Sequence, residues 1–364
     1  MTSLKVTLVA GIDPAQTRPG GIRSYVLGLA RYLASTGADV TLLGMGGPAH
    51  NEPFRFVAVT ADSHASSLAF HLGLRKTIRH RTVSEGVIHA QRPDDLVPFL
   101  AQYRRPPLVA TVHGDPLPGI RDRHGWAAST VYRRWESKAV AASARLLFVD
   151  RASREAFSRR YPQQAAKFVD TAVGIDLDGF RPGVPGEARR AWGLDDRPHV
   201  LFAGRFEREK NLELLARALA LCETHPTLLL AGAGRSTATF PSLLNGVPHR
   251  FLGVVPHEQM ASLFSAVDAT MLPSIREAMP LACLESLACG TPVVATRAGR
   301  LPEIVQSGAN GFVVDGIPAR FAQAIDQVIH ASKQMRERCR ASVENFGWDH
   351  VGPSLIQVYR EVLE

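Results

Sequence analysis

Short apolar runs alternate along the chain with segments in which apolar residues recur every three or four positions. The runs have the length of buried strands, and we expect strands at residues 6–11, 40–43, 54–59, 87–89, 107–112, 145–149, 199–203, 227–230, 269–272 and 292–296. The intervening segments predict helices; Tyr25, Leu29 and Leu33, for example, fall on one helical face. Such alternation is typical of α/β domains, so we predict doubly wound parallel sheets.

Chain length and one change of composition predict two domains. A single hydrophobic core rarely exceeds about 250–300 residues, whereas this chain has 364. Residues 182–198 are rich in Pro, Gly and charged residues, a composition typical of a linker. We therefore expect a first domain at residues 1–181, a linker at 182–198 and a second domain from residue 199 onward.

The most informative stretch runs from Ser274 to Thr296 and reads SIREAMPLACLESLACGTPVVAT. Pro280 suits the first turn of a helix, because its missing N–H would be unpaired there in any case. Leucines follow at helical spacing, Gly290 is typical of a helix end, and residues 292–296 predict a short strand. The stretch is therefore expected to form one loop-helix-strand unit of an α/β sheet.

Two carboxylates mark this unit, Glu277 in the loop and Glu285 in the helix. Carboxylates accept hydrogen bonds from vicinal hydroxyls, such as those of a ribose or a hexose. The helix N-terminus also offers unpaired N–H groups and a partial positive charge, which together favour a phosphate. The residues expected at this anion site are Ala278, Met279, Pro280 and Leu281. The alternative is a surface helix with solvated acids.

Three further segments place suitable groups beside predicted strands or helices. The loop GRFEREKN follows the strand at 199–203. Its Arg205 can donate to two phosphate oxygens at once, and its Lys210 adds a mobile positive charge. Gly20 and Gly21 precede a helix, where a bare backbone lets a ligand approach closely. His113 follows the strand at 107–112, at the edge where open α/β sheets bind ligands. A solvated loop, a tight turn and a structural histidine are the alternatives.

These segments resemble the motifs of the retaining nucleotide-sugar glycosyltransferases of family 4. The two glutamates separated by seven residues, with Pro280 and the ending Gly290-Thr291-Pro292, resemble the E-x7-E signature of that family. GRFEREKN resembles its diphosphate loop, and the resemblance extends over essentially the whole chain. One departure is Val173, which precedes Gly174 where many members have Asn.

The resemblance implies a GT-B fold, in which two Rossmann-like domains face each other across a cleft. The domain at 1–181 would bind the acceptor and the domain at 199–345 would bind the nucleotide-sugar. A final helix within 346–364 would cross back to the first domain. Many of the residues named above would then line the cleft.

Residue roles also follow from the resemblance. Glu277 and His113 would contact the donor sugar, Arg205 and Lys210 would hold the two phosphates, and Glu285 would bind the ribose hydroxyls. The nucleotide base would meet backbone groups, and the Gly pair would face the diphosphate; the glycine and valine positions concerned are Gly20, Gly21, Gly253 and Val254.

The implied reaction is transfer of a hexose-type sugar from a UDP- or GDP-linked donor to an acceptor hydroxyl, with retention at the anomeric carbon. Fixed cations and a helix N-terminus would stabilise the leaving diphosphate, so we expect neither a metal nor another cofactor. A GT-B epimerase or phosphorylase, or a silent nucleotide-sugar-binding subunit, would present similar motifs. A nicotinamide enzyme is disfavoured, because Thr237 occupies the place of the third glycine in G-x-G-x-x-G.

The charge distribution bears on the acceptor. The net charge is +8, and residues 1–180 carry all of the excess while the remainder is balanced. A basic half favours an anionic partner, either a phosphorylated or lipid-linked acceptor or a membrane surface, although a solvated Arg-rich surface would look the same. A small natural-product acceptor also remains open. Nucleic acid is disfavoured, since no recognition motif or aromatic stacking platform accompanies the charge.

Cysteine usage and targeting signals add little chemistry. The four cysteines form no C-x2-C pair and no His cluster accompanies them, which argues against a disulfide framework and a zinc site. The N-terminus lacks a signal-peptide pattern, and no stretch is long and apolar enough to span a bilayer. We expect a cytoplasmic protein. Peripheral contact with the inner face of the membrane is compatible with this expectation.

Overall fold

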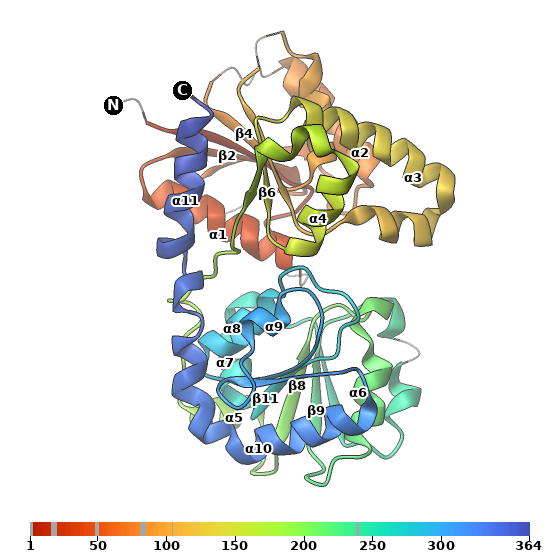
Figure 1. The fold of residues 1–364 in the computed structure, drawn as a ribbon. Coiled ribbons are helices and arrows are strands. Elements are labelled where there is room, and N and C mark those ends of the chain that lie inside the picture. Colours follow the sequence, from red (N-terminus) through yellow and green to blue (C-terminus); the bar gives the residue numbers. More distant parts are fainter. Residues whose placement is uncertain (1–2, 16–19, 48–50, 81–84, 104, 238–239) are drawn as a thin grey trace. The chain divides into compact units, whose positions relative to one another are not determined.

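A computed structural model of the chain describes residues 3–15, 20–47, 51–80, 85–103, 105–237 and 240–364 (Figure 1). The contacts divide the chain into two compact units. The first comprises residues 1–16, 22–174 and 348–364, and the second comprises residues 17–21 and 175–347. The division falls between Gly174 and Ile175, ahead of the boundary expected at residue 181.

The first unit is built on a seven-stranded parallel sheet with the order β3-β2-β1-β4-β5-β6-β7. Most strands are continuous apolar runs, as expected for a sheet covered on both faces. Their bounds are β1 Lys5–Val9, β2 Asp39–Met45, β3 Arg55–Thr60, β4 Val87–Ala90, β5 Leu108–Val112, β6 Arg145–Phe148 and β7 Phe168–Asp170.

Helices cover this sheet and supply its core. A buried cluster joins Ile88 and Ala90 of the sheet to Leu74 of α2, Phe99 of η1 and Ala139 of α3. These three helices therefore pack on the same side of the sheet. The helical elements of the unit are α1 Gly21–Ser35, α2 Ser67–His80, η1 Pro93–Ala101, α3 Pro116–Ala142, α4 Arg151–Arg160, η2 Pro162–Lys167 and α11 Trp348–Glu361.

The last helix, α11, completes the first unit. The Trp348 indole packs against two glycines: a Cβ on Gly28 would lie 2.6 Å from the indole Nε1, and one on Gly174 would lie 2.5 Å from its Cδ2. Neither position can carry a side chain without moving the tryptophan. The C-terminal helix is thus fitted into the first unit by glycines from two distant parts of the chain.

The second unit contains a six-stranded parallel sheet with the order β10-β9-β8-β11-β12-β13. Its strands are β8 His199–Ala203, β9 Thr227–Ala231, β10 His249–Gly253, β11 Ala269–Leu272, β12 Val293–Thr296 and β13 Gly311–Val314. Its helical elements are α5 Pro185–Trp192, η3 Arg208–Lys210, α6 Leu212–Leu219, η4 Arg235–Thr237, η5 Phe240–Leu244, α7 His257–Ala266, α8 Leu281–Ala288, α9 Leu301–Ile304, α10 Pro318–Ala341 and η6 Glu344–Phe346. The prediction of two doubly wound α/β domains is confirmed.

One local feature differs from the sequence-based expectations, and one helix of the first unit is irregular. Residues 182–198, which were expected to be a linker, contain helix α5. The Pro and Gly residues that suggested a linker lie at the two ends of this helix. Pro185 occupies the first turn and Gly193 the left-handed C-cap, with φ 61°. Helix α3 starts at Pro116 and is broken by the backbone of Gly125, with φ 78° and ψ −178°.

No helix within the described ranges has both the length and the apolar character that crossing a membrane requires.

Candidate active site

The loops after β8 and β11 lie side by side at one edge of the second sheet. These strands are hydrogen-bonded neighbours, although β9 and β10 separate them in sequence. From β8 the sheet grows outward in one direction, and from β11 it grows in the other; ligands of open α/β sheets bind at such a switch point. The N–H of Ile275 donates to the Glu209 carbonyl at 2.8 Å and so joins the two loops.

Lys210 and Glu277 form an ion pair at this switch point. The Lys210 Nζ donates to Glu277 Oε1, and the Ser274 hydroxyl donates to the same oxygen at 2.7 Å. The two side chains are only 18% and 10% exposed, so water screens their attraction incompletely. The structure therefore brings together the cation expected to hold phosphate and the carboxylate expected to hold the sugar.

Gly299 supports the loop that carries Glu277. Its φ of 52° lies in the left-handed region, and a Cβ there would come within 1.8 Å of the Glu277 carbonyl oxygen. The adjacent N–H of Arg300 donates to the Ala278 carbonyl at 3.3 Å. The close backbone approach fixes the height of the Glu277 loop above the sheet, and only glycine permits it.

Glu285 lies on α8 and is almost completely buried. Burial raises the pKa of its carboxyl group to about 7. Helix α8 starts at Leu281, and Pro280 is its N-cap with an extended backbone, one residue later than the expected start. Ala278 and Met279 lie in the loop directly before this cap, so the residues expected to form an anion site surround a true helix N-terminus.

The loop that carries Arg205 rests on two glycines after β9. A Cβ on Gly232 would lie 1.9 Å from the Gly204 carbonyl, and one on Gly234 would lie 2.5 Å from the Phe206 carbonyl. The segment that superficially matched a dinucleotide motif therefore serves as a close support for the charged loop. Arg205 itself is largely exposed and lies 3.6 Å from Glu209, so its side chain is not tightly held.

The remaining candidates are spread over several elements. Gly253 ends β10 with φ 67°, and its carbonyl accepts from the N–H of Gly232 at 2.6 Å. Val254 follows and is partly exposed. Gly20 directly precedes α1 and Gly21 is its first residue. Gly253 and Val254 thus lie at the same sheet edge as the charged loops, one strand beyond β9.

His113 follows β5 in the first unit and is held by a residue that the sequence reasoning missed. Its Nε2 lies 2.9 Å from Oε1 of Gln91, which follows the neighbouring strand β4 and is buried. Burial lowers the pKa of His113 to about 4, so its ring is neutral near pH 7. With Nε2–H donated to Gln91, Nδ1 carries the free lone pair. The strand-end rule that selected His113 would also have selected Gln91.

His89 is an internal structural residue. Its Nε2 lies 2.7 Å from the Thr111 hydroxyl and its Nδ1 lies 2.7 Å from the Tyr359 hydroxyl of α11. Burial, with a contribution from nearby His113, lowers the pKa of His89 to about 3. The neutral ring thus connects two strands of the first sheet to the C-terminal helix.

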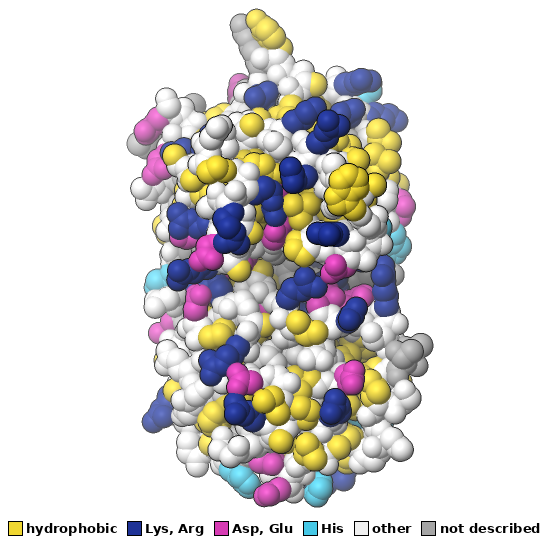
Figure 2. Space-filling model, turned by 45° about the vertical axis from the view of Figure 1, so that its right-hand side comes forward, with side chains coloured by type: hydrophobic (Ala, Val, Ile, Leu, Met, Phe, Trp, Pro, Cys, Tyr) yellow, Lys and Arg dark blue, Asp and Glu magenta, His cyan; other side chains and the backbone are white. Residues whose placement is uncertain are grey.

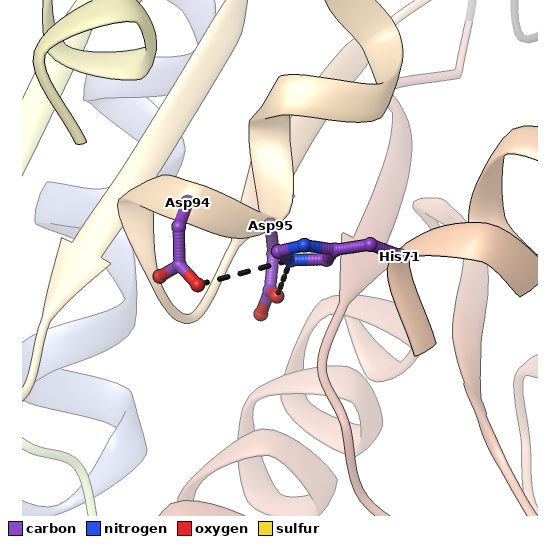
Figure 3. A group of neighbouring side chains, drawn as sticks. All are labelled: His71, Asp94 and Asp95. Carbon is purple, nitrogen blue, oxygen red and sulfur yellow. Dashed lines mark hydrogen bonds and ion pairs between the residues drawn. The ribbon is translucent and has the colours of Figure 1, made fainter. Parts of the chain in front are cut away.

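A second buried group of titratable side chains lies between α2 and η1 (Figure 3). His71 Nε2 is 2.9 Å from Asp95 Oδ1 and 3.7 Å from Asp94 Oδ2. Within the described residues this is the arrangement whose donor atoms are close enough to hold a metal ion. Both carboxylate oxygens of Asp94 already accept hydrogen bonds, however. Arg92 donates to Oδ2 at 2.6 Å and to Oδ1 at 3.1 Å, and the Tyr132 hydroxyl donates to Oδ1 at 3.1 Å. We interpret the group as an ionic network that ties α2, η1 and α3 together.

Comparison with known proteins identifies the family. Residues 19–179 match the model described as Glycosyltransferase Family 4, and residues 186–346 match Glycosyl transferases group 1. A D-inositol 3-phosphate glycosyltransferase of Xylanimonas cellulosilytica is 32% identical, with 96% of this chain and 93% of the relative covered. The chain belongs to glycosyltransferase family 4. A Mycobacterium leprae relative of the same description is 30% identical over 94% of the chain and 89% of the relative.

Solved structures support the GT-B fold of this family 4 glycosyltransferase. Sucrose-phosphate synthase from Thermosynechococcus elongatus matches with a TM-score of 0.85 at 24% identity, covering 99% of each chain. The Anabaena protein HepE in complex with UDP-glucose matches with a TM-score of 0.76 at 20% identity, also covering 99% of each chain. The two parallel-sheet units are therefore the Rossmann-like domains of a GT-B enzyme that transfers a sugar.

Proposed function

We propose that this glycosyltransferase moves a hexose-type sugar from a nucleoside diphosphate to a hydroxyl of a phosphorylated small molecule, with retention and without a metal. The observation that carries the proposal is the Lys210–Glu277 ion pair at the switch point of the second sheet. A paired cation and carboxylate suit a ligand that has an anionic phosphate beside a polyhydroxylated ring. The names of the relatives and the UDP-glucose complex of HepE support this choice of acceptor and donor.

The nucleotide would bind along the carboxyl edge of the second sheet. The ionised Glu285 carboxylate would accept hydrogen bonds from both ribose hydroxyls. The base would lie against the backbone at Gly253 and Val254. The diphosphate would meet Lys210, Arg205 and the N-terminus of α8. Apart from Glu285 on α8, these groups follow β8, β10 and β11 at one edge of the second sheet, so a single extended ligand would span them.

The ion pair would exchange partners when the donor binds. In the structure the Lys210 charge is balanced by Glu277. A diphosphate brings two phosphates to the same place and attracts the lysine more strongly than one carboxylate does. Glu277 Oε1 would then be released to accept hydrogen bonds from sugar hydroxyls, while Ser274 continues to hold it in position.

In the transfer step the acceptor oxygen would form a bond to the anomeric carbon as the bond from that carbon to the phosphate oxygen breaks. The acceptor proton would pass to the departing phosphate on the same face, which gives retention and a nucleoside diphosphate as the second product. Lys210, Arg205 and the helix N-terminus would stabilise the charge on that leaving group. Nδ1 of the neutral His113 ring would accept a hydrogen bond from a sugar hydroxyl.

Thermal unfolding with UDP, GDP, ADP and dTDP, each with and without EDTA, tests the donor and the metal requirement. A ligand at about 100 times its Kd adds roughly 2.7 kcal/mol of stability. We expect a rise of several degrees in Tm with UDP that EDTA leaves unchanged. A shift that EDTA abolishes would contradict the metal-free site.

Product analysis then tests the reaction. The enzyme is incubated with UDP-glucose and inositol 3-phosphate, and proton NMR reports the anomeric configuration of the product. We expect an α-linked product from the α-linked donor. Donor binding without any product would indicate a silent subunit, a requirement for inorganic phosphate would indicate a phosphorylase, and conversion without acceptor would indicate an epimerase.

A further inference from the structure

The turn after β5 places His113 directly before a glycine. The N–H of Val149 donates to the Val112 carbonyl at 3.4 Å, so backbone pairing holds the chain up to the residue before His113. Gly114 follows with φ 122°, in the left-handed region that glycine enters freely. The direction in which the chain leaves His113 therefore depends on what holds the next residue, Asp115.

Helix α3 gives this turn little support. Asp115 is the N-cap of the helix and accepts from the N–H of Leu117 at 3.2 Å. The helix is broken at Gly125, and among its residues, all of which the structure describes, burial begins only at Tyr132. The first part of α3 is therefore not embedded in the core, and the turn needs a contact from another element.

Arg160, the last residue of α4, provides that contact. Its Nη2 donates to Asp115 Oδ2 at 2.5 Å, and its Nη1 donates to Glu136 Oε2 at 2.8 Å. Asp115 lies at the start of α3, whereas Glu136 lies in the part of the helix after the break. One guanidinium group thus joins the turn that follows His113 to the buried part of α3.

Arg160 is itself held in place. Figure 2 shows Lys and Arg side chains spread over one face of the first unit, whereas the Arg160 side chain is only 18% exposed. Its guanidinium carbon lies 5.1 Å from the centroid of the Phe157 ring. Glu136 is completely buried, and without the cation its carboxylate would have no counter-charge, which is costly. Glu136 therefore keeps Arg160 in position, and Arg160 keeps Asp115 in position.

We propose that Arg160 is a positioning residue for His113. Through Asp115 it fixes the turn that carries the imidazole ring, while Gln91 holds Nε2 of the ring. The ring is thus supported once through the backbone and once through its side chain, which leaves Nδ1 with a fixed direction. The importance of this direction for transfer rests on the sugar contact proposed above for His113.

Asp115→Asn tests the contact while the helix cap is kept. Asparagine is a good N-cap, but its single oxygen keeps the cap only by giving up the bond from Arg160. We expect kcat to fall about tenfold, since small misplacements are costly. The Kd of UDP should stay unchanged, because the groups proposed to bind the nucleotide belong to the second unit.

Arg160→Lys is the second test of the same contact. Lysine keeps a positive charge beside the buried Glu136, but it lacks the fork that reaches two carboxylates. Its kcat should fall by a similar factor. The double variant with Asp115→Asn should lose no more than the larger single loss, since both changes break one contact. Additive losses would overturn the proposal.

The second unit offers a matched control. Arg189 donates to Asp268 at 2.7 Å, and these side chains are 19% and 20% exposed, against 18% and 17% for Arg160 and Asp115. Asp268 also accepts from a backbone N–H, that of His199, and it precedes β11 at the edge of the sheet opposite the candidate site. Asp268→Asn should lower Tm as much as Asp115→Asn but leave kcat unchanged. Equal losses of kcat in the two variants would show that stability alone is responsible and would overturn the proposal.

The titration of His113 tests the proposal without any assay of transfer. Burial lowers the pKa of His113 to about 4, so the wild-type ring should stay neutral between pH 5.5 and 8. NMR of protein with ¹³C-labelled histidine, assigned with His113→Gln, follows this ring. In Asp115→Asn we expect the ring to become hydrated and its pKa to rise toward about 6.5. Loss of a neighbouring carboxylate by itself would lower the pKa, so a rise reports displacement of the ring.

The two readouts separate this proposal from the proposed function. An unchanged titration in Asp115→Asn would overturn the role of Arg160, even in an enzyme that transfers sugar. A raised pKa in a protein whose wild type forms no sugar product would support that role and count against the proposed function alone.

Discussion

The two units place their polar groups at the carboxyl edges of similar sheets in different ways. In the second unit, the Lys210–Glu277 pair is formed by charged side chains on loops and is partly open to solvent. In the first unit, His113 is a neutral ring held by a hydrogen bond to Gln91. A sheet edge of one architecture therefore supports either a charged or a neutral polar surface.

The difference matches the two chemical tasks that the proposed reaction sets. A departing diphosphate carries charge that fixed cations stabilise, and such groups must remain mobile enough to change partners. Hydroxyl groups of a sugar or an acceptor are neutral, and they are oriented best by donors and acceptors whose own directions are fixed. We expect charge removal to be most damaging in the second unit, and orientation changes to be most informative in the first.

The largest effect is expected from Lys210→Ala. In the proposed mechanism Lys210 balances the charge of the leaving diphosphate, so turnover of the variant should fall about 100- to 1,000-fold, a loss similar to that of a key transition-state donor. Initial rates at saturating donor give kcat, and a Tm scan reports folding.

Arg205→Gln is the matched comparison for Lys210→Ala, and its loss should be smaller because the Arg205 side chain is largely exposed. A Lys210→Ala enzyme with nearly normal kcat would remove the lysine from the mechanism.

The next effect concerns the support of the Glu277 loop. In Gly299→Ala the new methyl group would overlap the Glu277 carbonyl, so the loop must move and kcat should fall at least about tenfold, since small misplacements are costly.

Gly308→Ala provides the control, because Gly308 also has a positive φ but nothing lies within 4 Å of its Cβ position. Both variants carry backbone strain of about 1–3 kcal/mol, measurable by denaturant unfolding. Equal losses of kcat in the two would show that strain, rather than displacement of Glu277, is responsible.

A pH dependence should distinguish the carboxylate on α8. Burial raises the pKa of Glu285 in the free protein to about 7, and the ribose contact proposed for this carboxyl group needs its ionised form. Donor affinity should therefore be full above pH 7 and decrease as pH falls, by about tenfold per pH unit well below 7, since one proton must leave on binding. Calorimetric titration with UDP between pH 5.5 and 8.5 measures this slope.

Glu285→Gln should bind UDP more weakly and without that slope. A slope that persists in the variant would assign the proton to another group.

The smallest effect is expected in the first unit. Gln91→Glu keeps the shape of the acceptor for His113 but adds a negative charge beside it. The charge favours the imidazolium and raises the pKa of His113 from about 4. The acid limb of the kcat profile should move to higher pH, with kcat at pH 8 reduced only severalfold. Gln91→Ala should lower kcat without moving the limb, and an unmoved limb in Gln91→Glu would exclude His113 from the profile.

The local structure around the candidate residues of the second unit was largely predictable, because their motifs are local in sequence. Glu277, Pro280 and Glu285 lie within one loop-helix unit, and Lys210 lies in a loop that follows a strand directly. What the sequence did not predict is that Lys210 and Glu277 pair with each other. That contact depends on β8 lying beside β11, and strand order is set by crossovers that no local pattern records.

The contacts of the first unit were less predictable, because they join residues that are even farther apart in the sequence. His89 and Tyr359 are 270 residues apart and meet only because α11 joins the first unit. Gln91 was within reach of sequence reasoning, since it follows a predicted strand as His113 does. Helix α5 was missed because Pro and Gly mark helix ends as well as linkers.

The return of α11 to the first unit also affects the order in which the protein matures on the ribosome. Domains generally fold as they emerge, the N-terminal one first. Here the second unit is complete once Gly347 has emerged, whereas the first still lacks Trp348 on its two glycines and Tyr359 on His89. The unit whose strands are synthesised first is thus the last to be finished, because its final helix is translated only after the whole of the second unit.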